Sequence, residues 1–396
     1  MHFLFVLAAL VLLFNLYATL DIILGTRKMR KLSDIPPLPE HQQPPVSVIV
    51  PACNEQDTIE PALRSLLALD YAALEIIVIN DRSTDRTGEV LRKIKTDHPR
   101  LHILEITELP EGWLGKNHAL HQGAKAARGE YLLFTDADIL FAKSTLARAM
   151  AVMIKEQQDH LALIFKNIAK GWLLNAMMVD AGGGLFFLFK PWKVSDPRSR
   201  HFIGVGAFNL VRKSVYLQIG GHEPIKMHPI DDIMLGKIIK RHGYRQECLS
   251  GYDFLTVRWY ASPRKMIQGL MKNIFALYNF RVCLVLAAIL MIGAMTILPV
   301  WGALFATGPA QLCFALAVVT RLASSAYGAI HTAATLWIIP FSLLTPYINI
   351  YIILKGMVTT LHNRGIIWRG TYYPLDQLKK TRSSHKCLTP GTQPDP

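Results

Sequence analysis

Two aspartates follow a strand-like run in the stretch 130-EYLLFTDADILF-141. Asp136 and Asp138 are two positions apart, so on an extended backbone their side chains face the same side. Two carboxylates this close repel each other unless a cation lies beside them. Their hard oxygens suit Mg²⁺ or Mn²⁺, which keep several waters and bridge the oxygens of substrate phosphates. An isolated D-x-D is more simply explained as a solvated loop in which each Asp bonds local backbone N–H groups. Here the D-x-D follows a strong strand pattern, which favours a metal site.

A second pair of acids, Asp231 and Asp232, stands in 228-HPIDDIMLGKIIKRHGY-244, before an apolar pattern with helical spacing. Helix capping and the helix dipole alone explain acids at such a place. The functional interpretation is a general base, a carboxylate that takes a proton from an attacking hydroxyl. The residues themselves leave both interpretations open.

Two more acids stand where strand-like runs end. Glu55 closes 51-PACNE-55, and Asp81 belongs to 80-NDRSTD-85. Glu55 is explained equally well as a favourable acid at a helix N-terminus, and Asp81 as a turn-forming residue. The functional alternative is a ligand contact, which for Asp81 would be a hydrogen bond from a base or a ribose.

Three side chains could contact an anionic ligand. Lys116 in 112-GWLGKNHA-119 is either a solvated lysine or a phosphate ligand. Arg258 and Trp259 precede a basic stretch that leads into an apolar region. They are either an interfacial pair with a snorkelling arginine, or an arginine on a diphosphate beside a tryptophan that stacks on a sugar or acceptor.

The glycine and cysteine patterns exclude several familiar sites. A dinucleotide fold needs G-x-G-x-x-G after its first strand, and 51-PACNEQ-56 has no glycine. The segment 112-GWLGKN-117 has a Gly-Lys pair but neither the spacing nor the hydroxyl of a P-loop. Five cysteines without a C-x-x-C give no zinc site or disulfide framework, which fits a reducing compartment.

The segments around these residues alternate between two patterns. The strand patterns are 46–51, 74–80, 101–106 and 131–136, and the helical patterns are 57–69, 84–98 and 116–129. This alternation predicts an α/β fold with a parallel sheet and right-handed crossovers. Ligands of such sheets bind beyond the carboxyl ends of the strands. We therefore expect Glu55, Asp81 and Asp136 to lie on one rim.

The rest of the chain has the character of a membrane protein. Half of the residues are hydrophobic (51%), and the mean hydropathy is +0.25. Residues 3–20 carry no charge and can cross a bilayer. No basic residue precedes this run and 27-RKMRK-31 follows it, so we expect a signal anchor, not a cleaved signal peptide, with its C-terminal side in the cytoplasm.

A second apolar region begins at residue 282. From there to residue 354 the only Asp, Glu, Lys or Arg is Arg321, so the region holds two or three spans. The net charge of +14 is concentrated beside apolar runs, which favours anionic lipid over nucleic acid as the partner. The segment 181-AGGGLFFLFKPW-192 is too short to span, so we expect either an interfacial segment or a core element of the soluble domain.

Taken together, these residues resemble the membrane-bound family-2 glycosyltransferases with a GT-A fold. The resemblance covers roughly residues 46–275 and follows the family's order. Its parts are 46-VSVIVPACNE-55, 77-IVINDRSTD-85, 113-WLGKNHAL-120, 133-LFTDAD-138, 230-IDDIML-235 and 257-VRWY-260. The stretch 364-RGIIWRGTYYPL-375 also resembles the end of such proteins. No single motif is decisive, but the ordered set is strong evidence.

The resemblance implies a Rossmann-like nucleotide-diphospho-sugar transferase domain that moves a sugar to an acceptor hydroxyl with inversion. UDP is the carrier that it favours, and Mg²⁺ or Mn²⁺ is the implied cofactor. The implied donor ligands are Glu55, Asp81, Lys116 and Asp136; the metal ligands are Asp136 and Asp138; the base is Asp232; and the acceptor or diphosphate contacts are Asp231, Arg258 and Trp259. Asp231 stands where the family usually has glutamate.

The acceptor follows from a departure from the family pattern. Of the family's Q-x-x-R-W motif, Arg258 and Trp259 match, but 254-FLTVRW-259 lacks the glutamine. That motif is best known from polymerising synthases, so the chain looks more like the enzymes that glycosylate ceramide, hopanoids or carotenoids. A membrane lipid is then the expected acceptor. The alternatives are a processive polysaccharide synthase and a non-catalytic membrane scaffold that kept the fold.

The expected organisation has five parts, in a multi-pass protein of the cell membrane whose catalytic domain faces the cytoplasm. They are an N-terminal anchor (1–25), a basic and Pro-rich linker (26–45), a GT-A catalytic domain with interfacial segments (46–275), a C-terminal transmembrane region (276–358) and a basic tail (359–396).

Overall fold

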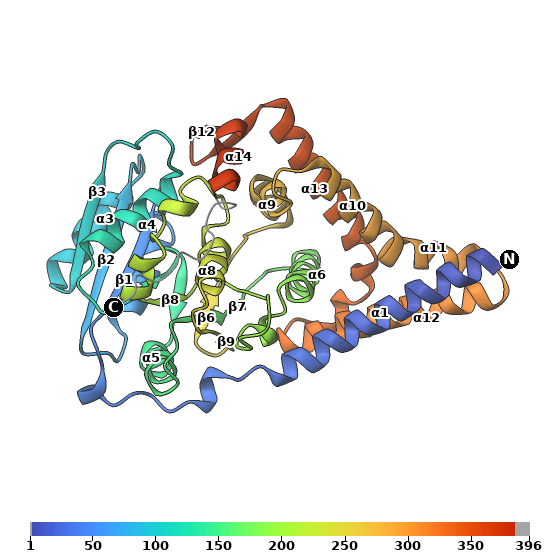
Figure 1. The fold of residues 1–396 in the computed structure, drawn as a ribbon, viewed down its shortest axis with the longest axis horizontal. Coiled ribbons are helices and arrows are strands. Elements are labelled where there is room, and N and C mark those ends of the chain that lie inside the picture. The colour runs from blue at the N-terminus through green and yellow to red at the C-terminus, as the bar shows by residue number, and fades with distance from the viewer. Residues whose placement is uncertain (1, 385–396) are drawn as a thin grey trace, which may run out of the picture. The chain divides into compact units, whose positions relative to one another are not determined.

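The structure is a computed structural model that describes residues 2–384, and the last part of the expected basic tail lies outside them. The chain divides into two compact units (Figure 1). Among the described residues, the helical unit comprises residues 2–28, 168–192 and 259–363, and the sheet unit comprises residues 29–167, 193–258 and 364–384. These limits differ from the expected domain of 46–275, because two helical stretches interrupt the sheet unit and the chain returns to it at Arg364.

A seven-stranded sheet forms the centre of the sheet unit, in the order β3-β2-β1-β4-β8-β6-β9. Its strands are β1 (Val46–Ala52), β2 (Leu74–Asp81), β3 (Leu101–Ile106), β4 (Tyr131–Phe134), β6 (His160–Ile164), β8 (Asn209–Arg212) and β9 (Gln246–Ser250). The first four strands pair in parallel, as the alternation predicts. The whole sheet is mixed, because β8, which the alternation did not predict, runs antiparallel to both β4 and β6.

Amphipathic helices follow the strands and cover the sheet. They are α2 (Ile59–Leu67), α3 (Thr87–Asp97), α4 (Gly115–Ala126), α5 (Thr145–Lys155), α7 (Lys213–Gln218) and α8 (Asp231–Arg241). Helix α4 packs closely on the sheet at Gly123, where an added Cβ would lie 2.5 Å from Ile49 Cγ2 and 2.7 Å from Ile79 Cδ1. These isoleucines belong to a buried cluster that also contains Leu120 and Leu235. The apolar contacts fix the N-termini of α4 and α8, which carry Lys116 and Asp231.

Two smaller sheets complete the sheet unit. One is formed by β5 (Ile139–Phe141), β10 (Leu255–Val257) and β7 (Lys166–Asn167). The other is an antiparallel hairpin of β11 (Gly365–Trp368) and β12 (Thr371–Pro374), which is followed by α14 (Leu375–Ser384). The first sheet continues directly from the loop that holds Asp136 and Asp138.

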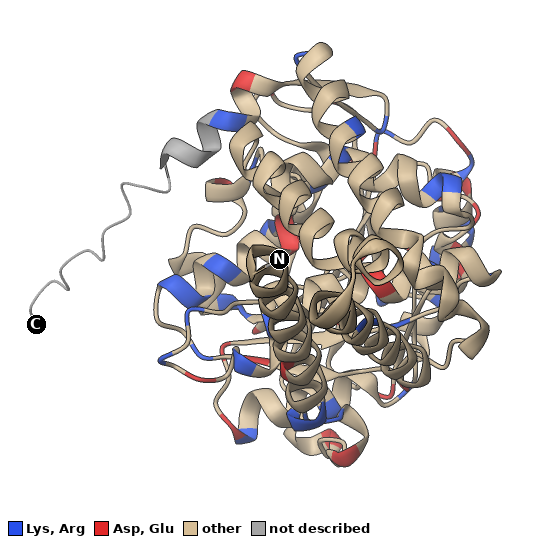
Figure 2. Ribbon diagram, turned by 90° about the vertical axis from the view of Figure 1, so that its right-hand side faces the viewer, with Lys and Arg blue, Asp and Glu red and all other residues tan. Residues whose placement is uncertain are grey.

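The helical unit contains four helices that are long and apolar enough to cross a membrane, or up to five with one bent pair, among the described residues. Its main helices are α1 (His2–Lys28), α6 (Trp172–Phe189), α9 (Pro263–Leu277), α10 (Val282–Ile292), α11 (Leu298–Phe305), α12 (Gly308–His331) and α13 (Thr345–His362). In Figure 2, α1 starts at the label N and is free of charged residues over most of its length. The C-terminal region agrees with the expected two or three spans, since α13 forms the bent pair with residues 336–343 at 58°.

The expectation that 181–192 is too short to span a membrane is wrong. Helix α6 begins at Trp172, and the stretch from Trp172 to Lys193 is long and apolar enough to cross. The polar residues Asn175 and Asp180 interrupt the apolar run and hide its full length in the sequence.

A polar cluster within the helical unit explains how a charge is tolerated in these helices. Arg321 Nη2 on α12 lies 2.9 Å from Asp180 Oδ1 on α6 and donates to the carbonyl of Ser342 at 2.8 Å. Asn349 Nδ2 on α13 donates to Asp180 Oδ2 at 2.8 Å. Ionisable groups in spans are costly unless paired in this way. The cluster therefore ties three helices and the broken segment before α13 together.

Candidate active site

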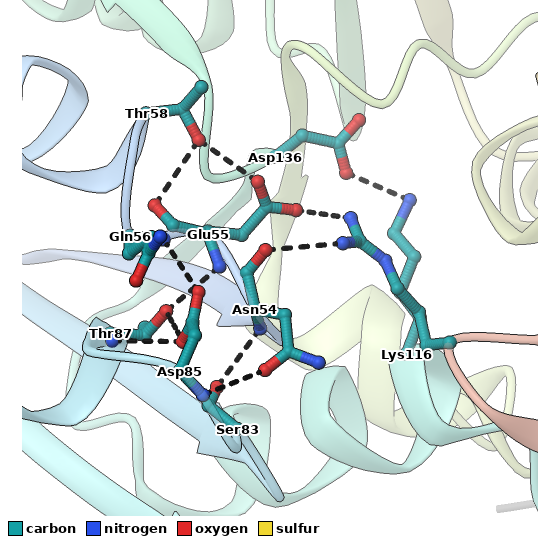
Figure 3. A network of polar contacts seen from close by, with 10 residues as sticks. Asn54, Glu55, Gln56, Thr58, Ser83, Asp85, Thr87, Lys116 and Asp136 are labelled. Atoms are coloured by element: carbon teal, nitrogen blue, oxygen red, sulfur yellow. Dashed lines mark hydrogen bonds and ion pairs between the residues drawn. The ribbon is translucent and has the colours of Figure 1, made fainter. Parts of the chain in front are cut away.

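The loops that follow β1 and β2 are locked to each other by side-chain hydrogen bonds (Figure 3). Asn54 Oδ1 accepts from the backbone N–H of Thr84 at 2.8 Å, and the backbone N–H of Glu55 donates to Thr87 Oγ1 at 2.8 Å. Asp85 Oδ1 in turn accepts from Thr87 N–H at 2.9 Å. Asn54 adopts a left-handed conformation (φ 55°) that asparagine tolerates better than most residues. These hydrogen bonds join the loops after β1 and β2 into one connected rim.

Glu55 lies on this rim with both carboxylate oxygens engaged. One oxygen accepts from Thr58 Oγ1 at 2.9 Å, and the other pairs with the guanidinium of Arg369 from the C-terminal hairpin. No local sequence pattern assigns a role to Arg369. The resemblance of 364–375 to the ends of family-2 enzymes was the one signal that could have drawn attention to it.

Asp81 ends β2, and its side chain is buried. Arg82 wraps back onto it, with Nε 2.7 Å from Oδ1 and Nη2 3.0 Å from Oδ2. The first residue of α4 must be small here, because a Cβ on Gly115 would lie 2.6 Å from Asp81 Oδ2 and 2.5 Å from Arg82 Nη2. The nucleotide role of Asp81 stays a prediction, and it requires Arg82 to share or release the carboxylate. No local sequence pattern predicts this contact of Arg82.

Lys116 connects the two acidic pairs. Its Nζ lies 2.9 Å from Asp136 Oδ1 and 3.2 Å from Asp231 Oδ1, and Figure 3 shows the pair with Asp136. Burial would lower the pKa of Lys116, but the surrounding carboxylates Asp136, Asp231 and Asp232 raise it above its usual value. Lys116 is therefore a fixed positive charge within an acidic site, as a phosphate ligand would need to be.

Gly206 brings the metal candidate Asp136 next to the base candidate Asp232. Its carbonyl accepts from the N–H of Asp136 at 3.0 Å, and its own N–H donates to Asp232 Oδ2 at 2.7 Å. A Cβ on Gly206 would lie 2.7 Å from Asp136 Oδ2 and 3.4 Å from Asp232 Oδ2. Only glycine leaves this space open. The segment 203-IGVG-206 was missed from sequence, because its role depends on backbone contacts.

Asp232 has the electrostatics of a general base. Burial raises the pKa of its carboxyl, and the neighbouring Asp231 raises it further, to about 7, although Lys116 acts in the opposite direction. Burial likewise raises the pKa of Asp231, which Lys116 opposes. A carboxylate with a pKa close to the working pH is well matched to accepting a proton.

Asp138 lies in a turn just before β5, not on the extended backbone that the sequence analysis assumed. Burial raises the pKa of its carboxyl to about 7, and the charges of Asp136 and Glu55 contribute. A divalent cation would relieve this repulsion. Among residues 2–384 no group of three His, Cys, Asp or Glu side chains could hold a metal by itself. Two carboxylates that share an ion with substrate phosphates are nevertheless the usual arrangement for Mg²⁺.

Arg258 directly follows β10, at the end of the three-stranded sheet where β5 begins. The antiparallel register pairs Val257 with Ile139, so Arg258 comes after β10 where Asp138 comes before β5. Its side chain is exposed, which suits the proposed diphosphate contact. Trp259 begins the next stretch of the helical unit, where its ring stacks on Tyr260 with centroids 5.4 Å apart. Its expected stacking on a sugar or acceptor stays a prediction.

Part of the chain is similar to proteins of known family. The family model described as Glycosyl transferase family 2 matches residues 47–219. The 4,4'-diaponeurosporenoate glycosyltransferase of Staphylococcus aureus is 26% identical over 232 residues, which are 56% of this chain and 58% of that protein. The chain thus matches less than two thirds of the relative's length.

A solved structure shares the fold. The mannosyltransferase PcManGT of Pyrobaculum calidifontis, in complex with GDP-Man and Mn²⁺, superposes with a TM-score of 0.53 at 21% identity. The match covers 91% of this chain and 99% of that one. The mixed α/β architecture is therefore that of the GT-A glycosyltransferases, which confirms the fold class expected from the sequence.

Proposed function

Because residues 47–219 form a glycosyl transferase family 2 domain within a GT-A fold, we propose that the chain is an inverting glycosyltransferase. It moves a sugar from a nucleotide-diphosphate sugar, of which a UDP-sugar is the favoured type, to a hydroxyl of a membrane lipid. The observation that carries the proposal is the cluster of Asp136, Lys116, Asp231 and Asp232 around Gly206. In this cluster a candidate general base, Asp232, lies beside a lysine, Lys116, whose positive charge could bind a diphosphate.

The proposed chemistry is a single displacement. The acceptor hydroxyl oxygen attacks the anomeric carbon of the donor while the bond from that carbon to the diphosphate oxygen breaks. Asp232 accepts the hydroxyl proton, and the nucleoside diphosphate leaves with the bonding electrons. Attack from the face opposite the leaving group inverts the anomeric configuration. A base whose pKa is raised to about 7 is ionised over a useful pH range and still basic enough to help.

The leaving diphosphate needs positive charge, which several groups of this site could supply. Lys116 is ionised, and Arg258 follows β10 at the end where Asp138 lies. Asp136 and Asp138 would hold Mg²⁺ or Mn²⁺, and such an ion would neutralise the charge that develops on the diphosphate. Glu55 and Asp81, at the ends of β1 and β2, would bind the nucleoside.

The nature of the acceptor is inferred from the helical unit and the relative. Four candidate spans would hold the protein in the membrane, where a lipid hydroxyl is available. The basic run 27-RKMRK-31 at the end of α1 favours a cytoplasmic location of the sheet unit, next to soluble nucleotide sugars. The relative from Staphylococcus aureus is named for a carotenoid acid, which supports a lipid-like acceptor.

The test uses the purified full chain in lipid nanodiscs with Mn²⁺ and a panel of UDP-, GDP- and dTDP-sugars. Nucleotide release is followed with and without a lipid extract of the native membrane. Release that requires the extract supports the proposal and identifies the donor. Release without lipid would indicate hydrolysis, a soluble acceptor or a polymer, and no release from any donor would contradict transferase activity.

A further inference from the structure

The hairpin of β11 and β12 belongs to the sheet unit although it follows the last helix of the helical unit. Its strands pair in antiparallel register, with Trp368 opposite Thr371. The two residues of the turn, Arg369 and Gly370, both have positive φ values, of 49° and 80°. The hairpin lies outside residues 47–219, so the family domain assigns it no role.

The hairpin contacts both of the loops expected to bind the nucleoside. Arg369 pairs with Glu55 in the loop after β1, and its Nη1 lies 3.5 Å from the carbonyl oxygen of Asn54. Thr371 Oγ1 accepts from Arg82 Nη1, in the loop after β2, at 3.1 Å.

A third contact reaches α4. The backbone N–H of Gly115, the first residue of α4, donates to the hydroxyl of Tyr373 at 3.1 Å. The Tyr373 side chain is buried, and it also raises the pKa of Arg82, after the larger contribution of Asp81. One short hairpin thus contacts Glu55, the residue after Asp81 and the residue before Lys116.

Arg369 occupies a turn position that is unfavourable for most side chains. A two-residue hairpin turn with two positive φ values prefers Asn-Gly or Gly-Gly, because most side chains are strained there. At this position the guanidinium of Arg369 is held on Glu55, an acid of the candidate site, and this contact carries the inference.

We propose that the hairpin 365–374 is a positioning element for the donor nucleotide, in which Arg369 acts through Glu55. The inference rests on the proposed function and deepens it. Arg369 and Thr58 hold the two oxygens of Glu55, so the carboxylate is ready to accept hydrogen bonds from the nucleoside. Arg369 also balances a negative charge that would otherwise repel the diphosphate. Arg369 does not contact the base candidate Asp232. Removal of the Arg369 side chain therefore weakens donor binding and leaves the chemical step intact.

The variant Arg369→Asn tests this role without disturbing the turn, since asparagine is favoured at that position. The matched control is Arg364→Asn. Arg364 has a similar positive φ of 50°, is exposed and carries the same charge. Binding of UDP, GDP and dTDP with Mn²⁺ is measured by calorimetry on the full chain in nanodiscs, together with donor KM, kcat and the thermal midpoint.

We expect Arg369→Asn to weaken nucleoside diphosphate binding and to raise the donor KM about tenfold, as for a hydrogen bond to a charged group. The kcat should stay within about twofold, and the thermal midpoint should not fall. Arg369→Lys should recover part of the loss, and Arg364→Asn should match the wild type. Equal behaviour of the two asparagine variants, or a loss in kcat alone, would overturn the inference.

A double-mutant cycle with Glu55→Gln separates positioning from direct contact. If Arg369 acts through Glu55, its substitution in the Glu55→Gln background should change binding by less than about twofold. A full tenfold loss in that background would overturn the positioning role and indicate a direct contact to the donor. If the wild type binds a nucleoside diphosphate but transfers no sugar, the proposed function fails while the binding comparison still decides the role of Arg369. If the wild type binds none of the three, both fail.

Discussion

Replacing Lys116 by glutamine removes the positive charge at the centre of the acidic cluster. The Nζ of Lys116 lies 3.2 Å from Asp231, whose side chain is 6% exposed, and 2.9 Å from Asp136, whose side chain is 39% exposed. The exposed pair contributes little, up to about 1 kcal/mol. Loss of one partner of a buried pair costs about 3–5 kcal/mol, because the other charge stays behind without compensation. We therefore expect a loss of about 3 kcal/mol in unfolding free energy at neutral pH.

The same substitution should change the pH dependence of transfer. Asp232 must be ionised to act as the base, so the rate of the wild type should rise with pH through about 7. Lys116 lowers the pKa of Asp232, against the effects of burial and Asp231. Its removal should move this acidic limb upward by about one pH unit, which corresponds to about 1.4 kcal/mol.

The assay pairs thermal unfolding in nanodiscs with rates of nucleotide release between pH 5 and 9. A loss of about 3 kcal/mol predicts a fall in the thermal midpoint of roughly 6–12 °C. The fall should shrink at acidic pH, where the carboxylates are protonated and no longer attract the lysine. Lys125→Gln is the control, since Lys125 lies exposed on the same helix. The reasoning is refuted if Lys116→Gln matches this control in both midpoint and pH profile.

Three further substitutions test separate parts of the account. Asp138→Asn should raise the Mn²⁺ concentration for half-maximal transfer at least roughly 100-fold and leave the thermal midpoint unchanged, since loss of even an outer-shell group costs roughly 10–100-fold in metal affinity. The control is Asp97→Asn, at an exposed position on α3. An effect of Asp138→Asn no larger than that of the control would show that Asp138 does not bind the metal. Gly206→Ala would place a Cβ 2.7 Å from Asp136 Oδ2. We therefore expect kcat to fall at least about tenfold and the unfolding free energy to fall by about 1–3 kcal/mol. A kcat of the variant equal to that of the wild type would show that this contact is unimportant. Arg321→Met leaves its aspartate partner on α6 unpaired and should cost about 3 kcal/mol in the helical unit; a midpoint equal to that of the wild type would contradict a structural role for the pair.

Much of the sheet unit could be predicted from local sequence. The strands β1, β2 and β3 begin and end within one residue of their predicted limits. In β1 and β2 the signal is a β-branched run that is almost wholly buried. The strand β3 lies at the edge of the sheet, and its residues alternate less clearly between buried and exposed. The antiparallel strand β8 escaped prediction, since four residues after an irregular loop give no periodic signal. Helix α6 was underestimated because Asp180 breaks the apolar pattern, and its partner Arg321 lies 141 residues away.

The residues of the candidate site likewise fall into two groups, those with a local sequence signal and those that act through contacts made only in the folded chain. Asp136 and Asp232 could be chosen as candidates because acids at a strand end and at a helix N-terminus have a recognisable local setting. Gly206 acts through its backbone, so its residue type carried no chemical hint. Arg369 lies 314 residues from Glu55 along the chain. Contacts of that range depend on the tertiary fold, which alternation and spacing do not specify.

The central claim is that Asp232 is the base of a transfer reaction to a membrane lipid. The most direct measurement follows a radiolabelled sugar from its nucleotide donor into the organic-extractable fraction of nanodiscs, for the wild type and for Asp232→Asn. The account predicts a single-sugar lipid product from the wild type and a loss of at least about 100-fold in the variant, with binding of nucleoside diphosphate retained. Equal incorporation by both proteins would contradict the assignment of the base, and label found only in a water-soluble polymer would contradict the lipid acceptor.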